Sequence, residues 1–279
     1  MTDLLVRRLL VDLTSPIPAR WNGGDAFRSA YFNALSMSFP VGEQFFIDSV
    51  RNGLKTLPEA DRAKYAEEVA GFIGQEATHR RVHALFNGHL EKLGFSNWVE
   101  RHAARRIQKQ AHLDVRNHVA GTAATEHLTA IFANWTMRHP EAFEGAEERL
   151  KTLWLWHAAE ESEHRCTAFD VYHAIGGSHT WRVRVFKYST YIFLADIGRQ
   201  TLLNLWQDKA LFKPGTWVSA WKLLFSQDGM LRGNYHHWKA YLSPSFHPSQ
   251  QAAEPSRQWL LDNPSAFAVV GAVAAGVLP

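Results

Sequence analysis

The stretch WLWHAAEESEHR, residues 154–165, carries three carboxylates and two histidines within eight residues, directly after two tryptophans. A solvated surface helix could hold this much charge, but the tryptophans indicate that the segment is at least partly buried. A buried carboxylate is costly unless it is paired or binds a cation. The stretch therefore suggests one wall of a metal site.

The motif Glu-x-x-His occurs in this stretch and once more in the chain. Here it is formed by Glu161 and His164, and earlier, in the run EATH, by Glu76 and His79. Positions i and i+3 lie on one face of a helix, so each pair can converge on one point. A single pair is weak evidence, because glutamate and histidine are common neighbours on protein surfaces.

Two further glutamates complete the pattern. Glu43 lies in FPVGEQFFI and Glu126 in AGTAATEHLTAIFA, and both surroundings are apolar. Glu43 precedes Glu76 by 33 residues and Glu126 precedes Glu161 by 35, which suits two antiparallel helix hairpins. This order resembles the ligand arrangement of ferritin-like dimetal-carboxylate bundles. We therefore predict that two metal ions are held by Glu43, Glu76, His79, Glu126, Glu161 and His164.

His157 precedes Glu161 by four residues and His164 by seven, so the three side chains share one stripe of a helix. A core histidine that supports the ligands would explain this position. We favour the alternative, in which His157 is a third imidazole ligand, because the stripe points at the metals.

Gln75 and Glu160 come immediately before the two motif glutamates. We expect Glu160 to hydrogen-bond His79 and Gln75 to hydrogen-bond His164, which would fix the histidine tautomers. For Gln75, a solvated position without a function is the alternative. The remaining polar neighbours are expected to be exposed (Glu163 and Arg165), packed (Cys166), structural (His83 and His127) or outside the ligand set (His236 and His237).

Apolar residues recur at helical spacing through most of the chain, and no convincing alternating β segment occurs. We predict a single all-α domain over residues 1–279, a ferritin-like four-helix bundle with additional C-terminal helices. An extended leader over 1–24 precedes the metal-binding core of about 26–175, and accessory helices and a tail fill about 179–279. Helices are expected over about 26–53, 58–93, 97–108, 111–137, 141–175, 179–209 and 215–239, with room for a short helix in the turn-rich end.

The composition limits the classes of function. The 279 residues are 46% hydrophobic and 20% charged, with a net charge of +3, which is typical of a globular protein. The densest basic run, RHAARRIQK at 101–109, is expected to be a solvated helix face or loop rather than a nucleic-acid patch. We therefore expect no nucleic-acid partner.

The chain has one cysteine, so an intramolecular disulfide is excluded. Charged residues interrupt the apolar run at the start, which argues against a secretory signal. The apolar end, residues 265–279, is shorter than the roughly 20 residues that span a bilayer. We expect a cytoplasmic protein with no membrane span.

Four segments resemble a bacterial family usually labelled predicted metal-dependent hydrolase: RWNGGD, FPVGEQFFIDSVR, FIGQEATHRRVH and WHAAEESEHRCTAFDVY. The resemblance covers roughly residues 15–245. Separately, the run His157, Glu161 and His164 is similar to the p-aminobenzoate N-oxygenase type of di-iron oxygenase, in which the extra histidine is a third nitrogen ligand. That resemblance implies a ligand set of Glu43, Glu76, His79, Glu126, His157, Glu161 and His164.

Four carboxylates and two or three imidazoles, with no thiolate, suit iron or manganese and can also hold zinc. We expect an Fe/Fe or Mn/Fe pair, with Mn/Mn or zinc as alternatives. The helices that carry the ligands also offer apolar and aromatic side chains, namely Phe39, Phe45, Phe46, Ile47, Phe72, Ile131, Phe132 and Trp154.

A dry pocket of this kind favours an oxygenase or oxidase that activates O2 and acts on a small organic substrate, aromatic or carboxylated. A hydrolase that uses a metal-activated water is the alternative, and ferritin-like iron storage is a third class. An oxygenase would also draw on an external electron donor.

Four basic residues are candidates for binding a substrate. Arg51, Arg80, Arg165 and Lys187 could anchor a carboxylate, and each has an equally good role at the surface or in an ion pair. The helices after Gly177 are expected to cap the bundle, shape a substrate pocket or form the face of a homodimer.

Overall fold

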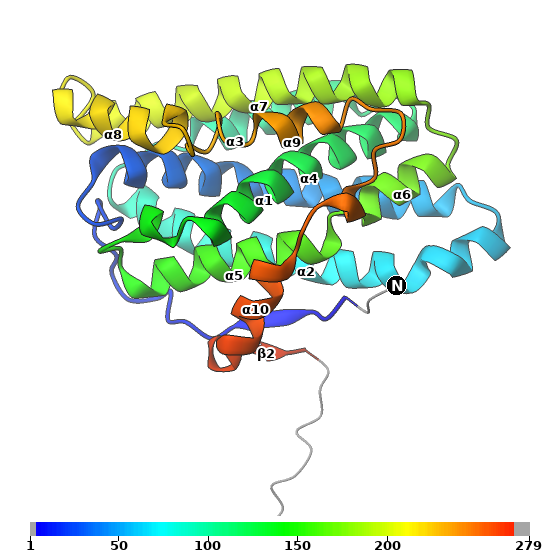
Figure 1. Cartoon of the computed structure of the whole chain (residues 1–279), viewed down its shortest axis with the longest axis horizontal. Helices are drawn as coiled ribbons and strands as arrows, with labels where there is room; N and C mark the ends of the chain where they lie inside the picture. Colours follow the sequence, from blue (N-terminus) through cyan, green and yellow to red (C-terminus); the bar gives the residue numbers. More distant parts are fainter. Residues whose placement is uncertain (1–3, 271–279) are drawn as a thin grey trace, which may run out of the picture.

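A computed structural model describes residues 4–270 of the chain. Four long helices form the core: α1 (Ala26–Lys55), α2 (Glu59–Lys92), α4 (Val115–Arg138) and α5 (Glu148–His164). They run side by side along the longest axis of the molecule (Figure 1). Helix α1 packs most extensively on α2, and α4 packs on α5. The prediction of an all-α helical bundle is confirmed.

Side-chain caps fix where three of these helices begin. Asp25 accepts a hydrogen bond from the backbone N–H of Arg28 at the start of α1, and Asp114 does the same for Arg116 at the start of α4. Glu147 caps α5. Such caps satisfy N–H groups that have no partner inside the helix, and each stabilises the helix by about 1 kcal/mol.

Pro40 lies inside α1 and cannot donate to the carbonyl of Ser36 one turn earlier. Asn87 of α2 satisfies that carbonyl instead, because its amide Nδ2 donates to it at 3.0 Å. The proline therefore connects α1 to α2 through a side chain, one turn before Glu43.

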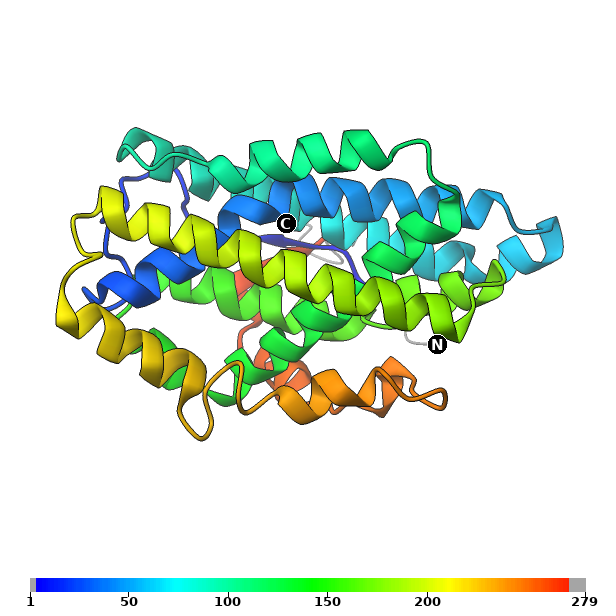
Figure 2. The same ribbon diagram turned by 90° about the horizontal axis from the view of Figure 1, so that it is seen from above.

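Additional helices cover one side of the core. Helix α7 (His179–Gln207) packs on α1 and α4, and α3 (Trp98–Gln110) packs on α1. Both lie on the side that faces the viewer in Figure 2. The chain after α7 forms α8 (Pro214–Phe225), α9 (Tyr235–Ala240), η2 (Pro248–Gln250), α10 (Glu254–Asp262) and η3 (Pro264–Ala266).

The helix expected over 141–175 is divided into three elements, η1 (Pro140–Phe143), α5 and α6 (Thr167–Ala174). Gly145 adopts a positive φ of 70°, so the chain turns before α5 begins. The second break lies between α5 and α6. In a continuous helix the N–H of Cys166 would donate to the carbonyl of Ser162, but here the guanidinium of Arg165 donates to that carbonyl. The helix expected over 215–239 is likewise divided, into α8 and α9.

One short β-sheet accompanies the helices, and no alternating segment of the sequence indicated it. Strand β1 (Arg7–Leu9), in the leader, pairs antiparallel with β2 (Phe267–Val269), with Arg7 opposite Val269. Three-residue strands are too short to show a period of two in the sequence. Part of the apolar end expected over 265–279 lies outside the described residues, and within them no helix is long and apolar enough to cross a membrane.

Candidate metal centre

The four core helices bring a group of carboxylates and imidazoles together inside the bundle. Helix α1 supplies one of them, α2 two, α4 one and α5 two, and none is more than 4% exposed. The group consists of Glu43, Glu76, His79, Glu126, Glu161 and His164.

The imidazole nitrogens and carboxylate oxygens of this cluster lie close together, but their contacts do not have the geometry of hydrogen bonds. His164 Nε2 lies 3.1 Å from Glu76 Oε1 and 3.3 Å from Glu126 Oε2. Glu161 reaches both histidines, with Oε2 at 3.5 Å from His164 Nε2 and Oε1 at 3.5 Å from His79 Nδ1. Glu161 therefore lies between the two imidazoles.

Two groups of three in this cluster have the arrangement of a metal site. Glu76, Glu161 and His164 offer ligand atoms within 4.8 Å of one another, and so do Glu43, Glu76 and His79. Glu76 belongs to both groups. The arrangement could therefore hold more than one cation, and Glu76 could contribute to either position.

Most ligand atoms of the cluster are buried without a hydrogen-bond partner among residues 4–270. A buried polar atom without a partner costs about 1–3 kcal/mol, and more if it is charged. The donor set therefore fits metal ions, which would satisfy these atoms. The atoms are both carboxylate oxygens of Glu43, Glu76 and Glu126, Oε2 of Glu161, Nδ1 of His79 and Nε2 of His164.

The pKa values of the glutamates also favour a site for cations. Burial raises the pKa of Glu43, Glu76 and Glu126 well above the ordinary value of a glutamate. Burial would also raise the pKa of Glu161, but His164 and the other histidines around it hold this pKa well below its usual range. These carboxylates cannot all ionise side by side unless positive charge compensates them, and bound cations would supply it.

The outer nitrogens of the two motif histidines have hydrogen-bond partners. His79 Nε2 lies 2.9 Å from Glu160 Oε2, and His164 Nδ1 lies 3.1 Å from Gln75 Oε1. Each contact leaves the other ring nitrogen directed at the cluster. Partners of this kind fix the tautomer and the ring orientation of a metal-binding histidine.

His157 lies at the edge of the cluster. Its Nε2 is 2.9 Å from Glu161 Oε1, and its Nδ1 is 2.6 Å from Nε2 of His83. His83 in turn hydrogen-bonds the Ser36 hydroxyl at 2.8 Å. Burial, followed by the charge on His79, lowers the pKa of His157 to about 4. The ring is therefore neutral at neutral pH, which is the form that binds metals.

One contributor to the site was not anticipated from the sequence. Arg7 of β1 donates to Glu160 Oε1 at 3.1 Å and to both carboxylate oxygens of Glu163, at 2.6 and 3.0 Å. Gln75 Nε2 also donates to Glu163, at 2.8 Å. Glu163, which was expected to be exposed, is half-buried because these donors surround it. The sequence carries no local sign of the contact, since 153 residues separate Arg7 from Glu160.

Arg165 was expected to point outward, but it is half-buried and donates to the backbone carbonyls of Pro248 and Gln251. Cys166 is also half-buried, and burial raises the pKa of its thiol to about 11. His127 is buried, and its Nε2 lies 3.2 Å from the backbone carbonyl of His237. These three side chains therefore pack or connect segments outside the cluster.

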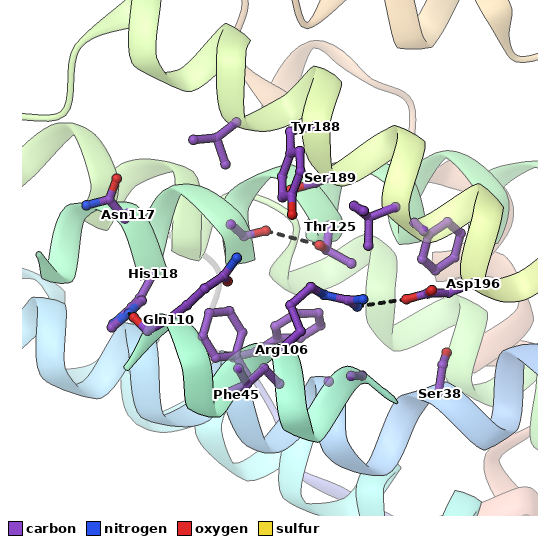
Figure 3. Close-up of a pocket in the computed structure, with 18 of the residues that line it drawn as sticks. Ser38, Phe45, Arg106, Gln110, Asn117, His118, Thr125, Tyr188, Ser189 and Asp196 are labelled. Carbon is purple, nitrogen blue, oxygen red and sulfur yellow. Dashed lines mark hydrogen bonds and ion pairs between the residues drawn. The ribbon is translucent and has the colours of Figure 1, made fainter. Parts of the chain in front are cut away.

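A cavity of about 460 Å³ adjoins the cluster between α1, α3, α4 and α7 (Figure 3). Glu43 lines it, together with Phe39, Phe45 and Phe46 of the aromatic set named from the sequence. Phe132 and Trp154 instead line a smaller cavity of about 40 Å³. The other members of that set pack in the interior, namely Ile47, Phe72 and Ile131.

The basic residues that were expected to anchor a substrate carboxylate do not line this cavity. They are Arg51, Arg80, Arg165 and Lys187. Arg106 does line it, although the run 101–109 was expected to be solvated. Its spacing from Val99 and Ala103, both buried, places it beside the apolar face of α3. That spacing is the signal that could have identified Arg106.

Comparison with known proteins adds one match. A family model described as predicted metal-dependent hydrolase matches residues 5–252. No curated protein and no solved structure matches the chain.

Proposed function

We propose that this chain, which belongs to the predicted metal-dependent hydrolase family, is an enzyme with a dinuclear metal centre. The observation that carries the proposal is the set of nine buried ligand atoms that have no hydrogen-bond partner among residues 4–270. The residues that would hold the ions are Glu43, Glu76, His79, Glu126, Glu161 and His164.

Glu160 and Gln75 would keep the imidazoles of His79 and His164 in place through the nitrogens that do not face the ions. His157 is proposed as a further nitrogen ligand. It can reach the cluster with Nε2 while His83 holds Nδ1. The neighbouring group of His79, His157 and Glu161 has ligand atoms within 4.8 Å of one another, which supports this role.

Oxygen and nitrogen ligands of this kind suit iron or manganese, and two such ions can supply O2 activation. The surroundings favour this chemistry, because the cluster is buried and the adjoining cavity has phenylalanine walls. We therefore propose O2-dependent oxidation of a small organic substrate, with an external electron donor, as the reaction. Hydrolysis by a metal-activated water is the second candidate, and the family description supports it.

The deciding experiment is metal analysis of the purified full chain, followed by O2 consumption after chemical reduction and by assays with ester and phosphate substrates. About two iron or manganese ions per chain with O2 uptake would support the oxidase or oxygenase. Zinc with ester or phosphate turnover and no O2 uptake would support the hydrolase. A cage that loads many iron ions per chain would contradict both and favour storage.

The ligand set has its own test. Glu126→Ala should remove at least one metal ion per chain and leave the helical circular dichroism unchanged, because the bundle core around it is apolar. Glu91→Ala is the matched control, since Glu91 is an exposed glutamate near the end of α2. Unchanged metal content in Glu126→Ala would show that the ligand set is wrong.

A further inference from the structure

The cavity beside Glu43 has the size and position of a substrate site. Its volume of about 460 Å³ lies within the range of pockets that bind small molecules, roughly 300–1,000 Å³. Glu43 contributes to both the wall of the cavity and the metal cluster. A molecule that fills the cavity would therefore lie beside the proposed metal centre.

The walls select an apolar ligand. Phe39, Phe45 and Phe46 of α1 face Ile192 and Phe193 of α7 across the cavity. Apolar surface that a ligand covers here contributes about 25 cal/mol per Å² to binding. Polar side chains also line the cavity, and Figure 3 shows several of them around Arg106, among them Gln110, Thr125 and Tyr188.

Arg106 gives the cavity a specific polar contact. Its Nη2 pairs with Asp196 of α7 at 2.8 Å, and Figure 3 shows the guanidinium reaching across the cavity toward that carboxylate. Its Nη1 is buried and has no hydrogen-bond acceptor among residues 4–270. A guanidinium has donors on more than one edge, so Asp196 leaves one edge for a second acceptor.

A carboxylate is the acceptor that fits this edge best. Arginine forms stronger, charge-assisted hydrogen bonds with carboxylates than with neutral oxygens. Arg184, which also lines the cavity, adds a second positive charge. A phosphate carries more negative charge than a carboxylate and would need more cationic donors, whereas Asp196 already pairs with Arg106 and leaves it one free edge.

We propose that the cavity binds an apolar carboxylic acid, with its carboxylate on Arg106 and its aromatic or aliphatic part against the phenylalanines toward Glu43. The inference rests on the proposed function, because the bound acid is the substrate of the proposed metal centre. It names the substrate class and a residue that determines specificity.

The test is calorimetric binding of 4-phenylbutanoate and octanoate to the full chain, metal-free and metal-loaded, beside the neutral analogues 4-phenylbutan-1-ol and octan-1-ol. The acids should bind more tightly than the alcohols. Arg106→Gln should weaken acid binding about 10- to 100-fold and leave alcohol binding unchanged. The matched control is Arg105→Gln, because Arg105 is exposed on the same helix; it should bind both classes as the wild type does.

A second variant tests the place of binding and does not depend on the folding of Arg106→Gln. A Cβ atom at Gly121 would meet only Phe45, at ordinary contact distance, and Gly121 lines the cavity, so Gly121→Leu should fold and place its side chain in the space that the ligand would occupy. It should abolish binding of acids and alcohols alike. Equal affinity for acids and alcohols, wild-type acid affinity in Arg106→Gln, or unchanged binding in Gly121→Leu would each overturn the inference.

The two proposals fail in different ways. A chain that holds two metal ions but does not bind the acids would overturn the inference and leave the dinuclear centre standing. A chain that binds the acids through Arg106 but holds no metal would overturn the proposed function, while the acid site remains.

Discussion

Replacing Arg7 with methionine should destabilise the protein and weaken metal binding together. The side chain of Arg7 is 7% exposed and contacts Glu160, whose side chain is fully buried, and Glu163, which is 29% exposed. Arg7→Met keeps an unbranched apolar stem but removes the guanidinium, with its charge and its donors. Glu160 would then lose its buried guanidinium partner and keep only the imidazole of His79.

Removing one partner of a buried ion pair costs roughly 3–5 kcal/mol. We expect about 3 kcal/mol, because Glu160 keeps its contact with His79 and Glu163 can gain water. With an unfolding entropy of about 2.1 cal/mol/K per residue over 279 residues, that cost lowers the Tm by about 5 °C. Metal affinity should fall about 10- to 100-fold, because Glu160 orients the His79 ring.

The measurements are thermal unfolding of the metal-free chain and metal titration against a competing chelator. Arg8→Met is the matched control, because Arg8 is the next residue of β1 and points to solvent. The cost of Arg7→Met should shrink in a Glu160→Gln background, where no carboxylate is left at that position. A cost equal to that of Arg8→Met, or one that is unchanged in that background, would refute the reasoning.

Two further predictions concern α2. Gln75→Leu should lower metal affinity about 10- to 100-fold, because His164 loses the partner of its Nδ1; chelator competition measures this, and wild-type affinity would contradict it. Gly71→Ala should destabilise the protein by about 1–3 kcal/mol in urea unfolding, since the new methyl carbon would lie 2.5 Å from Leu4 Cβ. At Gly88 on the same helix a Cβ would meet no other atom, so Gly88→Ala should stabilise the protein by about 1 kcal/mol. An increase in stability for both variants would show that the leader does not pack against Gly71 as described.

The part of the site that local periodicity controls could be predicted from the sequence. Glu76 and His79, like Glu161 and His164, share a helix face because i and i+3 are neighbours on any α-helix. Near-equal separations in the two halves of the chain predicted two hairpins, and the structure pairs α1 with α2 and α4 with α5. The ends of helices could also be predicted where a capping residue or a glycine lies at the end.

Contacts between distant segments could not be predicted in this way. Arg7 and Arg8 are identical in type and adjacent, yet one is buried and the other exposed, because the strand that pairs with them lies at Phe267–Val269. Arg106 belongs to a basic run whose composition predicts exposure to solvent. It lines a cavity because α7 packs nearby and supplies part of the wall. In both cases the decisive partner is more than 80 residues away.

The two sides of the proposed metal centre differ in polarity and in the number of hydrogen bonds that restrain the ligands. On the side of α2 and α5, Gln75 and Glu160 connect the histidines to Arg7 and Glu163, so this side is polar and fixed by hydrogen bonds. On the side of Glu43, the centre adjoins the apolar cavity. A substrate would therefore approach past Glu43, where fewer hydrogen bonds restrain the ligand, while the network opposite keeps the imidazoles in place. Helix α7 completes the cavity wall, which a four-helix bundle alone would lack, and this favours an enzyme over a storage protein.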